Sequence, residues 1–326
     1  MTQSARALLH AIAAALVMGA AAAVPAQEPF PSRPIHVIVP YPAGGTTDQI
    51  ARAIQKPMAE FLGQPVVVEN KAGAAGSIGV EALVRSAPDG YTVGIIPTGN
   101  IAVNPTLFRN LPYKASDLAP VTMLATAENV LVVNQNLPVA SLRDLIGLAK
   151  AKPGTISFAS PGAGSQAHLA GELLALRTGT QLVHVPYKGI APAVTDLLGG
   201  HVSMMFSQVI SAIEPIRTGK LKALGVASPK RNALLPQTPT IAEQDLPGFE
   251  AVSWYALMVP AATPQAIVDR LQAEVSKILK SRTVTDKLAQ LGADTDGGPA
   301  RALAATIESE TARWAEVIRK QNIPLQ

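Results

Sequence analysis

The sequence predicts an α/β protein of two lobes, each built on a parallel or mixed β-sheet. Short β-branched runs alternate with helical patterns along the chain, which is typical of α/β folds. Two passages, Met123–Val133 and Phe249–Pro260, are candidate hinges, and no low-complexity linker divides the chain. If the chain crosses between lobes at both passages, its C-terminal helices return to the first lobe and a cleft separates the lobes.

Length and composition support this prediction and exclude several classes of protein. The 326 residues suit about two domains of roughly 150 residues each. Hydrophobic residues make up 48% of the chain and charged residues 15%, which excludes an intrinsically disordered protein. Aromatic residues make up only 4% of the chain. The net charge is +4, and the lysines and arginines form no dense cluster in the sequence, so we expect no nucleic-acid partner.

The N-terminus has the pattern of a secretory signal peptide. Arg6 precedes the apolar run 7–23, and Val24 and Ala26 fit the −3 and −1 positions of a cleavage site. A transmembrane anchor is the alternative, but this run is rich in alanine and ends in a cleavage-like site. The chain contains no cysteine, so a disulfide, a cysteine zinc site and a lipoprotein anchor are excluded. We expect residues 1–26 to be removed near Ala26 and the mature protein to reside in the periplasm.

Nine runs rich in β-branched residues are the candidate strands of the mature chain. They are Ile35–Val39, Val66–Glu69, Thr92–Ile96, Val130–Val133, Ile156–Ala159, Leu182–Val185, Val202–Phe206, Ala223–Ser228 and Tyr255–Val259. Helical patterns follow most of them.

The first helix has a marked start and one internal conflict. Thr46 can act as its N-cap, with Gln49 three residues later as in a capping box. Pro57 interrupts the pattern, and we expect a kink or a break there. The apolar face consists of Ile50, Ile54, Met58 and Leu62. A second helix begins near Ser165, and the last amphipathic helix spans about 303–318.

The same sequence pattern occurs twice, in "VPYPAGGTTDQIARAI" (Val39–Ile54) and in "TISFASPGAGSQAHLAGELL" (Thr155–Leu174). Each copy consists of a strand, a Pro/Gly turn, a hydroxyl residue and a helix. The first turn of a helix has unpaired N–H groups and a partial positive charge, which together bind anions. Two such helix ends could face each other across a cleft, although a plain corner between strand and helix remains the alternative.

Dinucleotide binding, metal binding and hydrolysis fit the residues less well than anion binding does. Gly162, Gly164 and Ala167 match a dinucleotide fingerprint, but the acid expected about 20 residues later is absent, and we expect no cofactor. The histidines lack metal-ligand spacing, so we expect no metal site. Ser165 with His168 could make an exported hydrolase, although no acid is placed to orient the histidine. We therefore expect a protein that is not an enzyme.

Three polar residues near the two turns have open roles. Asp48 either complements the helix dipole, worth about 0.3–1 kcal/mol, or binds a ligand amino group or orients the loop. His168 either donates to a ligand or is simply a helix residue. Lys188 either pairs with an acidic ligand or is a solvated turn residue.

Several motifs in one order make the whole mature chain resemble the Bug family, the periplasmic substrate-binding proteins of tripartite tricarboxylate transporters. They are "IVPYPAGGTTDQIAR", "GQPVVVENKAGAAGSIG", "APDGYTVG", "TISFASPGAGSQAHLAGELL", "VPYKGIAPAVTDLLGGHVSMMF" and "GKLKALGVAS". The resemblance implies a bilobed periplasmic-binding-protein fold (type II-like) with two crossovers. Lobe 1 would hold residues 27–126 and 253–326, and lobe 2 would hold residues 127–252.

The resemblance also implies that the protein binds a ligand and catalyses no reaction. A small organic carboxylate would be held in the cleft between the lobes and delivered to membrane transporter subunits, and we expect the binding protein to be a monomer. A role as a signalling sensor partner would use the same closed surface and stays open. The carboxylate itself, a mono- or dicarboxylate, is not identified by the sequence. Amino acids, dicarboxylates, aromatic acids and nicotinate-like compounds all stay open.

The contacts implied by the resemblance lie in four segments. They are Tyr41, Ala43, Gly44, Gly45, Thr46, Thr47 and Asp48 in the first loop; Thr98 and Asn100 in a turn; Ser160, Gly162, Ala163, Gly164, Ser165 and His168 in the second lobe; and Tyr187, Lys188 and Gly189 at the rim. Many relatives carry phenylalanine where this chain has Tyr41. Its hydroxyl makes a polar contact to the distal part of the ligand possible.

Overall fold

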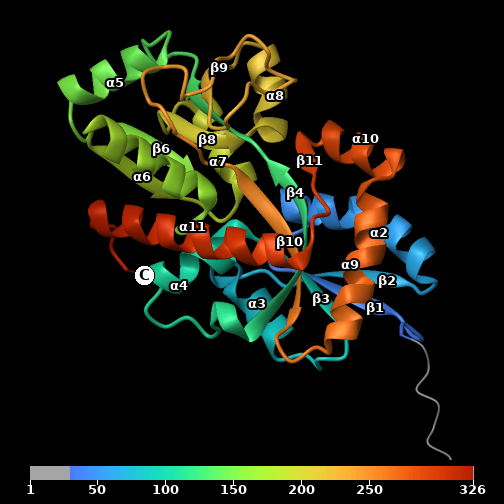
Figure 1. The fold of residues 1–326 in the computed structure, drawn as a ribbon. Helices are drawn as coiled ribbons and strands as arrows, with labels where there is room; N and C mark the ends of the chain where they lie inside the picture. Colours follow the sequence, from blue (N-terminus) through green and yellow to red (C-terminus); the bar gives the residue numbers. More distant parts are fainter. Residues whose placement is uncertain (1–29, 326) are drawn as a thin grey trace, which may run out of the picture. The chain divides into compact units, whose positions relative to one another are not determined.

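Two mixed β-sheets flanked by helices make up the fold of the computed structural model, which describes residues 30–325 (Figure 1). The first sheet has six strands. In spatial order they are β11 (Ala293–Thr295), β4 (Leu118–Ala127), β10 (Ser253–Pro260), β3 (Thr92–Pro97), β1 (Ile35–Val39) and β2 (Val66–Asn70). The second sheet has five strands. In spatial order they are β7 (Leu182–Pro186), β6 (Ile156–Ser160), β8 (Met204–Gln208), β5 (Asn129–Asn134) and β9 (Leu221–Val226).

The pairing places one inner strand of each sheet between two parallel neighbours. β1 runs parallel to β2 and β3, and β6 runs parallel to β7 and β8. β10 is antiparallel to β3 and β4, and β5 is antiparallel to β8 and β9. The two Pro/Gly turns of the sequence follow β1 and β6, so each lies at the carboxyl end of a strand with parallel neighbours, where α/β sheets bind ligands.

Ten α-helices and three short helical turns surround the sheets in the described part of the chain. The helices are α2 (Thr46–Leu62), α3 (Ser77–Val84), α4 (Asn104–Leu107), α5 (Leu142–Ala151), α6 (Gln166–Thr178), α7 (Ile190–Gly199), α8 (Val209–Arg217), α9 (Gln265–Leu279), α10 (Arg282–Gln290) and α11 (Ala300–Lys320). The short turns are η1 (Ala74–Gly76), η2 (Gly99–Val103) and η3 (Ala115–Asp117). None of these helices is long and apolar enough to cross a membrane. The predicted signal peptide, residues 1–26, lies outside the described residues.

The chain passes from one sheet to the other twice. It leaves the first sheet between β4 and β5, where only Glu128 separates the two strands, and it returns between β9 and β10. The predicted α/β class and the two crossovers are therefore confirmed. β4 and β11 were not predicted, because β4 contains Pro120 and little alternation and β11 has only three residues.

Helix α2 differs from its prediction in two ways. It runs through Pro57 from Thr46 to Leu62, so the expected break is wrong. Apolar side chains on both sides of the proline, Ile54 and Met58, are fully buried, and this burial outweighs the lost backbone hydrogen bond. Its N-cap is Gly45 without a side-chain cap bond, so the predicted capping by Thr46 is also wrong.

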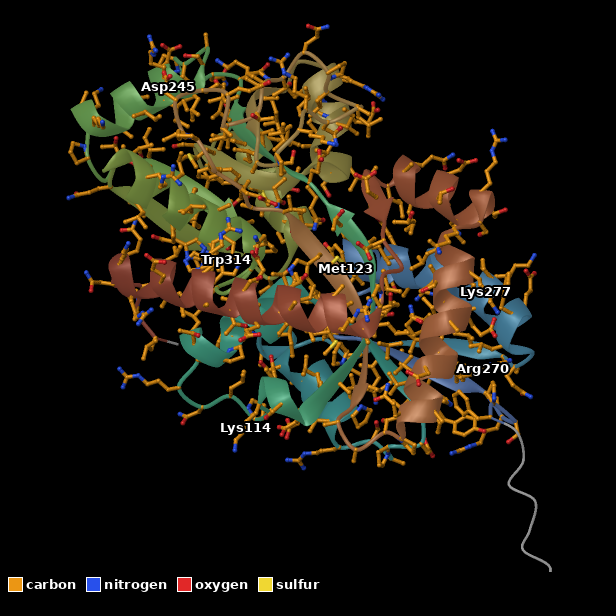
Figure 2. All side chains as sticks on the ribbon, viewed as in Figure 1. Lys114, Met123, Asp245, Arg270, Lys277 and Trp314 are labelled. Atoms are coloured by element: carbon orange, nitrogen blue, oxygen red, sulfur yellow. The ribbon has the colours of Figure 1, made fainter. Side chains whose placement is uncertain are left out.

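The C-terminal helix α11 contacts elements of both sheets. Its first half packs into a core with β3, β4 and β10 through Leu303, whereas Trp314 and Ile318 join the core of the five-stranded sheet. In Figure 1, α11 runs alongside α4 and α6, and Figure 2 shows Trp314 between α11 and α6. The lobe boundaries implied by the resemblance stay a prediction.

Close packing of α6 on β6 generates a testable prediction. A Cβ atom at Gly171 would lie 2.4 Å from the ring of Phe158, which is fully buried. We expect Gly171→Ala to destabilise the protein by about 1–2 kcal/mol, because overpacking costs more than the gain in helix propensity. The exposed Gly147 of α5 has nothing within 4 Å of such a Cβ, so Gly147→Ala should stabilise slightly. Urea unfolding measures both, and an equal effect of the two substitutions would contradict the prediction.

Candidate functional site

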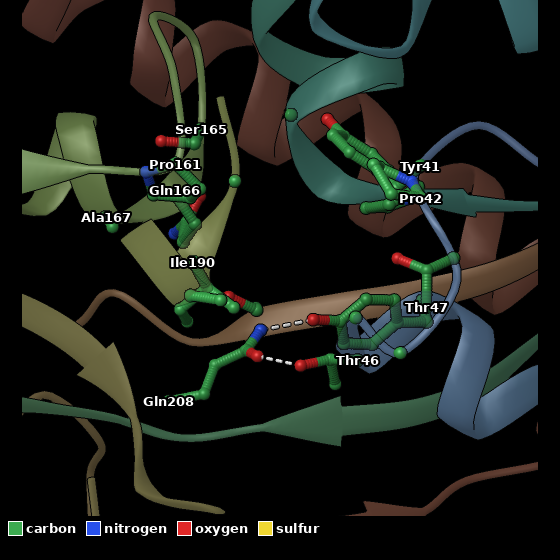
Figure 3. Close-up of a pocket in the computed structure, with 18 of the residues that line it drawn as sticks. Tyr41, Pro42, Thr46, Thr47, Pro161, Ser165, Gln166, Ala167, Ile190 and Gln208 are labelled. Carbon is green, nitrogen blue, oxygen red and sulfur yellow. Dashed lines mark hydrogen bonds between the residues drawn. The ribbon is translucent and has the colours of Figure 1, made fainter. Parts of the chain in front are cut away.

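A cavity of about 380 Å³ lies where the loops after β1 and β6 meet, and it is lined by elements of both sheets (Figure 3). Its lining is mostly small and apolar with a few polar groups, as in binding sites for small molecules. The lining residues are Tyr41, Pro42, Ala43, Gly44, Gly45, Thr46, Thr47, Pro97, Thr98, Gly99, Asn129, Pro161, Ser165, Gln166, Ala167, Lys188, Gly189, Ile190, Ala191, Pro192, Phe206, Gln208, Ser253 and Tyr255.

The first loop presents the start of α2 to the cavity. Gly44 has φ +84°, which a residue with a side chain rarely adopts, and this conformation turns the chain toward the helix. Since Gly45 supplies no side-chain cap, the first-turn N–H groups of Thr46 and Thr47 are left for a ligand. Their hydroxyl groups lie in the same wall of the cavity.

Asp48 lies behind this loop, 2% exposed, and does not line the cavity. Its carboxylate accepts hydrogen bonds from Gly44 N (2.9 Å), Arg52 Nε (3.0 Å) and Asn70 Nδ2 (3.0 Å). Burial alone would raise the pKa of Asp48, but these hydrogen bonds and the charge of Arg52 hold its pKa below the usual value. The structure therefore favours a role in orienting the loop.

The second loop presents the start of α6. The helix begins near Ser165, as predicted, and Ser165 is its N-cap: its Oγ accepts from His168 N (3.3 Å) and donates to Gly162 O (2.7 Å). Gly164 N donates to His168 Nδ1 (3.2 Å). The other ring nitrogen, Nε2, is 3.6 Å from Glu172 Oε1.

A stack of three rings supports the second loop from behind. His168 and His184 stack with centroids 3.9 Å apart, and Phe158 stacks on His184 at 4.9 Å. The Nε2 atom of His184 is 2.7 Å from Ser160 Oγ, which in turn donates to Gly162 O (3.0 Å). Burial, with His168 alongside, lowers the pKa of His184 to about 3, so this ring is neutral.

These contacts give no support to a hydrolase. Ser165 Oγ donates to a backbone carbonyl, and Nδ1 of His168 is occupied by Gly164 N. A serine nucleophile requires a histidine nitrogen to accept its proton. Metal chemistry has no support either, because no cluster of three or more His, Asp or Glu residues within residues 30–325 could hold an ion.

The turn η2 approaches the second loop closely. A Cβ atom at Gly99 would lie 2.6 Å from Gly164 O, so only glycine fits at this position. The hydroxyl of Thr98 exchanges hydrogen bonds with Trp254 N (2.8 Å) and Trp254 O (3.1 Å) and is thereby fixed. This turn joins the first loop, the second loop and β10 around one space.

The predicted contact residues divide into two groups. One group lines the cavity: Tyr41, Ala43, Gly44, Gly45, Thr46, Thr47, Thr98, Ser165, Lys188 and Gly189. The other group lies outside the lining: Asp48, Asn100, Ser160, Gly162, Ala163, Gly164, His168 and Tyr187. Asn100 accepts from the Tyr41 hydroxyl (3.1 Å), and Tyr187 donates to Asp196 (2.7 Å). Which of them touch a ligand stays a prediction.

Two polar residues that sequence reasoning missed connect the walls of the cavity. Gln208, at the end of β8, accepts a hydrogen bond from the Thr46 hydroxyl and donates one to the Tyr255 hydroxyl on β10 (Figure 3). Burial raises the pKa of Tyr255 to about 12, so its hydroxyl stays protonated. The signal available was a polar pair, Ser207 and Gln208, after the predicted strand Val202–Phe206.

Gln166 is the third missed residue, and it lies in the first turn of α6. Its side chain lines the cavity on the same side as Pro161 and Ile190 (Figure 3). Both polar atoms of its amide are buried and have no hydrogen-bond partner in the structure. Lys188 is the one charged side chain among the lining residues, and none of them is acidic.

The depressed pKa of His184 predicts a loss of stability in acid. Between pH 6.5 and about 3 the unfolded chain binds a proton at this histidine that the folded chain does not, so stability falls as the pH drops through this range. We expect His184→Gln to flatten this part of the stability curve, measured by thermal unfolding at a series of pH values. His201→Gln, at an exposed position, is the control, and equal curves for wild type and His184→Gln would contradict the prediction.

Comparison with known proteins relates this geometry to solute receptors. The family model described as "Tripartite tricarboxylate transporter family receptor" matches residues 50–323. The protein BugT of Bordetella pertussis is 40% identical over 321 residues, covering 98% of both chains. The solved periplasmic binding protein BugD is similar with TM-score 0.83 and 34% identity over 91% of this chain and 100% of BugD. The solved structure of R. palustris Rpa4515 with adipate gives TM-score 0.85 and 35% identity over 90% of this chain and 99% of that one.

Proposed function

Because this chain belongs to the tripartite tricarboxylate transporter receptor family, we propose that it captures a small organic carboxylate in the cavity between its two loops and delivers it to transporter subunits. The family and its solved relatives are solute-binding proteins, not enzymes. A related structure holds adipate, a dicarboxylate, which supports an acid as the ligand.

The observation that carries the proposal is the meeting of two helix N-termini at one cavity. The N–H groups of Thr46 and Thr47 in α2, and of Gln166 and Ala167 in α6, lie in first helical turns at its walls. Such groups stabilise an anion without any cationic side chain. Lys188 adds one positive charge at the cavity.

The absence of acidic side chains from the lining narrows the ligand class. An amino acid would place its ammonium group in the cavity, and a buried ammonium needs a negative partner. Asp48 is the nearest acid in the first loop, but its carboxylate is bonded to Gly44, Arg52 and Asn70. The proposal is therefore a carboxylate without an amino group.

The remaining expectations belong to the same proposal. The mature protein is a periplasmic monomer that begins after Ala26, with lobe 1 from residues 27–126 and 253–326 and lobe 2 from residues 127–252. The division of the strands between two sheets supports these bounds. Delivery to a transporter and signalling to a sensor use the same closed surface, and a pulldown with membrane proteins, comparing empty and liganded protein, distinguishes them.

A ligand panel tests the proposal. With refolded, ligand-stripped protein, adipate, succinate or benzoate at about 100 times its Kd should stabilise the fold by about 2.7 kcal/mol, measured by thermal unfolding. Aspartate and glutamate should give no shift, because their ammonium group finds no counter-charge. If the broad carboxylate panel gives no shift, or only the amino acids do, the proposed function is wrong.

A substitution tests whether the cavity is the site. Gly99→Ala should weaken whichever acid binds by at least about tenfold, because a Cβ there collides with Gly164 O and forces η2 and the second loop apart. Gly147→Ala, far from the loops on α5, should leave the affinity unchanged. Calorimetric titration measures both, and an unaltered affinity in Gly99→Ala would place the binding site elsewhere.

A further inference from the structure

The amide of Gln166 is a buried side-chain group in the cavity wall that has no hydrogen-bond partner among the described residues. The residue is 7% exposed, it lines the cavity, and neither Oε1 nor Nε2 has a hydrogen bond within the described structure. Burying an amide without hydrogen bonds is unfavourable, so such a group in a binding protein points to a partner that arrives with the ligand.

The other amides of the cavity differ in this respect. Gln208 is bonded through both amide atoms, to Thr46 and to Tyr255. Asn129 donates to Ala251 O (2.6 Å) and to Ser253 Oγ (3.2 Å). These two amides therefore hold the walls of the cavity together, whereas the amide of Gln166 makes no hydrogen bond to any described residue.

We propose that Gln166 is a specificity-determining residue that selects a carboxylate bearing a neutral group able both to donate and to accept a hydrogen bond, a hydroxyl or a carboxamide. This inference rests on the proposed function, since the carboxylate itself would occupy the helix N-termini. The amide offers one donor, Nε2, and one acceptor, Oε1. A second carboxylate would satisfy only Nε2, and an ammonium group would satisfy only Oε1.

The neighbours of Gln166 strengthen the selection. Pro161 and Ile190 lie on its side of the cavity and carry no side-chain polar group that could replace a missing partner (Figure 3). An acid that lacks the second polar group leaves the amide buried and unpaired. A site built to bond a hydroxyl rejects the analogue without it more strongly than an apolar pocket rejects an added hydroxyl.

Calorimetry on ligand-stripped full-length mature protein tests this selection with matched acids. Malate and succinamate are each compared with succinate, and 4-hydroxybenzoate is compared with benzoate. Wild type should bind the neutral-group member of at least one pair about tenfold more tightly, which corresponds to about 1.4 kcal/mol. In the Gln166→Leu variant, the ratio of the two affinities should fall to a value between about 1 and about 2.

A matched variant and a ligand-free measurement complete the experiment. Gln208→Leu removes an amide that is bonded to protein, so it should weaken both members of a pair and preserve their ratio. The empty Gln166→Leu protein should unfold at a higher temperature than wild type, because the unpaired amide is gone. If the leucine variant does not fold, Gln166→Ala takes its place in the experiment. The preference for the acid with the neutral group should again disappear.

Three results would overturn the inference. Wild type binding both members of every pair equally, or Gln166→Leu keeping the wild-type ratio, would show that Gln166 does not select the ligand while the proposed function stands. If no acid of either kind binds to wild type, the proposed function fails and the inference fails with it.

Discussion

The buried carboxylate of Asp48 is the interaction on which the first half of the site depends. It binds the Gly44 N–H group of the loop, Arg52 one helical turn later and Asn70 at the end of β2. Asn70 also donates to Tyr41 O (3.0 Å), so the loop is held at both of its ends. An acid in the first turn complements the helix dipole, and here it does so from behind the loop. The first turn of α2 is thereby held at the wall of the cavity.

The second loop is held by different chemistry with the same result. Within the loop, Ser165 Oγ donates a hydrogen bond to a backbone carbonyl and His168 Nδ1 accepts one from a backbone N–H group. His184 supports the loop through its hydrogen bond with Ser160. The His184 ring is neutral, so it supports the loop without adding charge near a bound anion. Two unrelated supports thus produce two similar helix ends.

Local sequence patterns predicted those strands and helix starts whose formation depends on residues nearby in the chain. The strands before the turns and the two helix starts follow from residues within a few positions of one another. Thr46 shows the limit, because the sequence around it fits a capping box, yet its hydroxyl bonds to Gln208, 162 residues away. Pro57 shows the same limit, since burial of Ile54 and Met58 by distant elements decides its helix.

The polar contacts of the cavity could not be predicted for the same reason. Gln208, Tyr255 and Gln166 lie on three different elements, and only the crossovers between the sheets bring them to one cavity. Gln166 was within the second loop segment, but nothing in its neighbourhood distinguishes an unpaired amide from a solvated one. That distinction comes from burial, which depends on the whole fold.

Carboxylate capture through backbone N–H groups leaves side chains free for selection. Any residue with the right φ and ψ can present an N–H group, so binding the anion requires glycine only at the turns and constrains few side chains. The side chains of Tyr41, Gln166 and Gln208 can then differ from one receptor to another without loss of the anion site. Of these, Gln208 is bonded to Thr46 and Tyr255, and Tyr41 is bonded to Asn100 and Ala75. The proposed discrimination between acids therefore falls to Gln166, whose amide makes no hydrogen bond to any described residue.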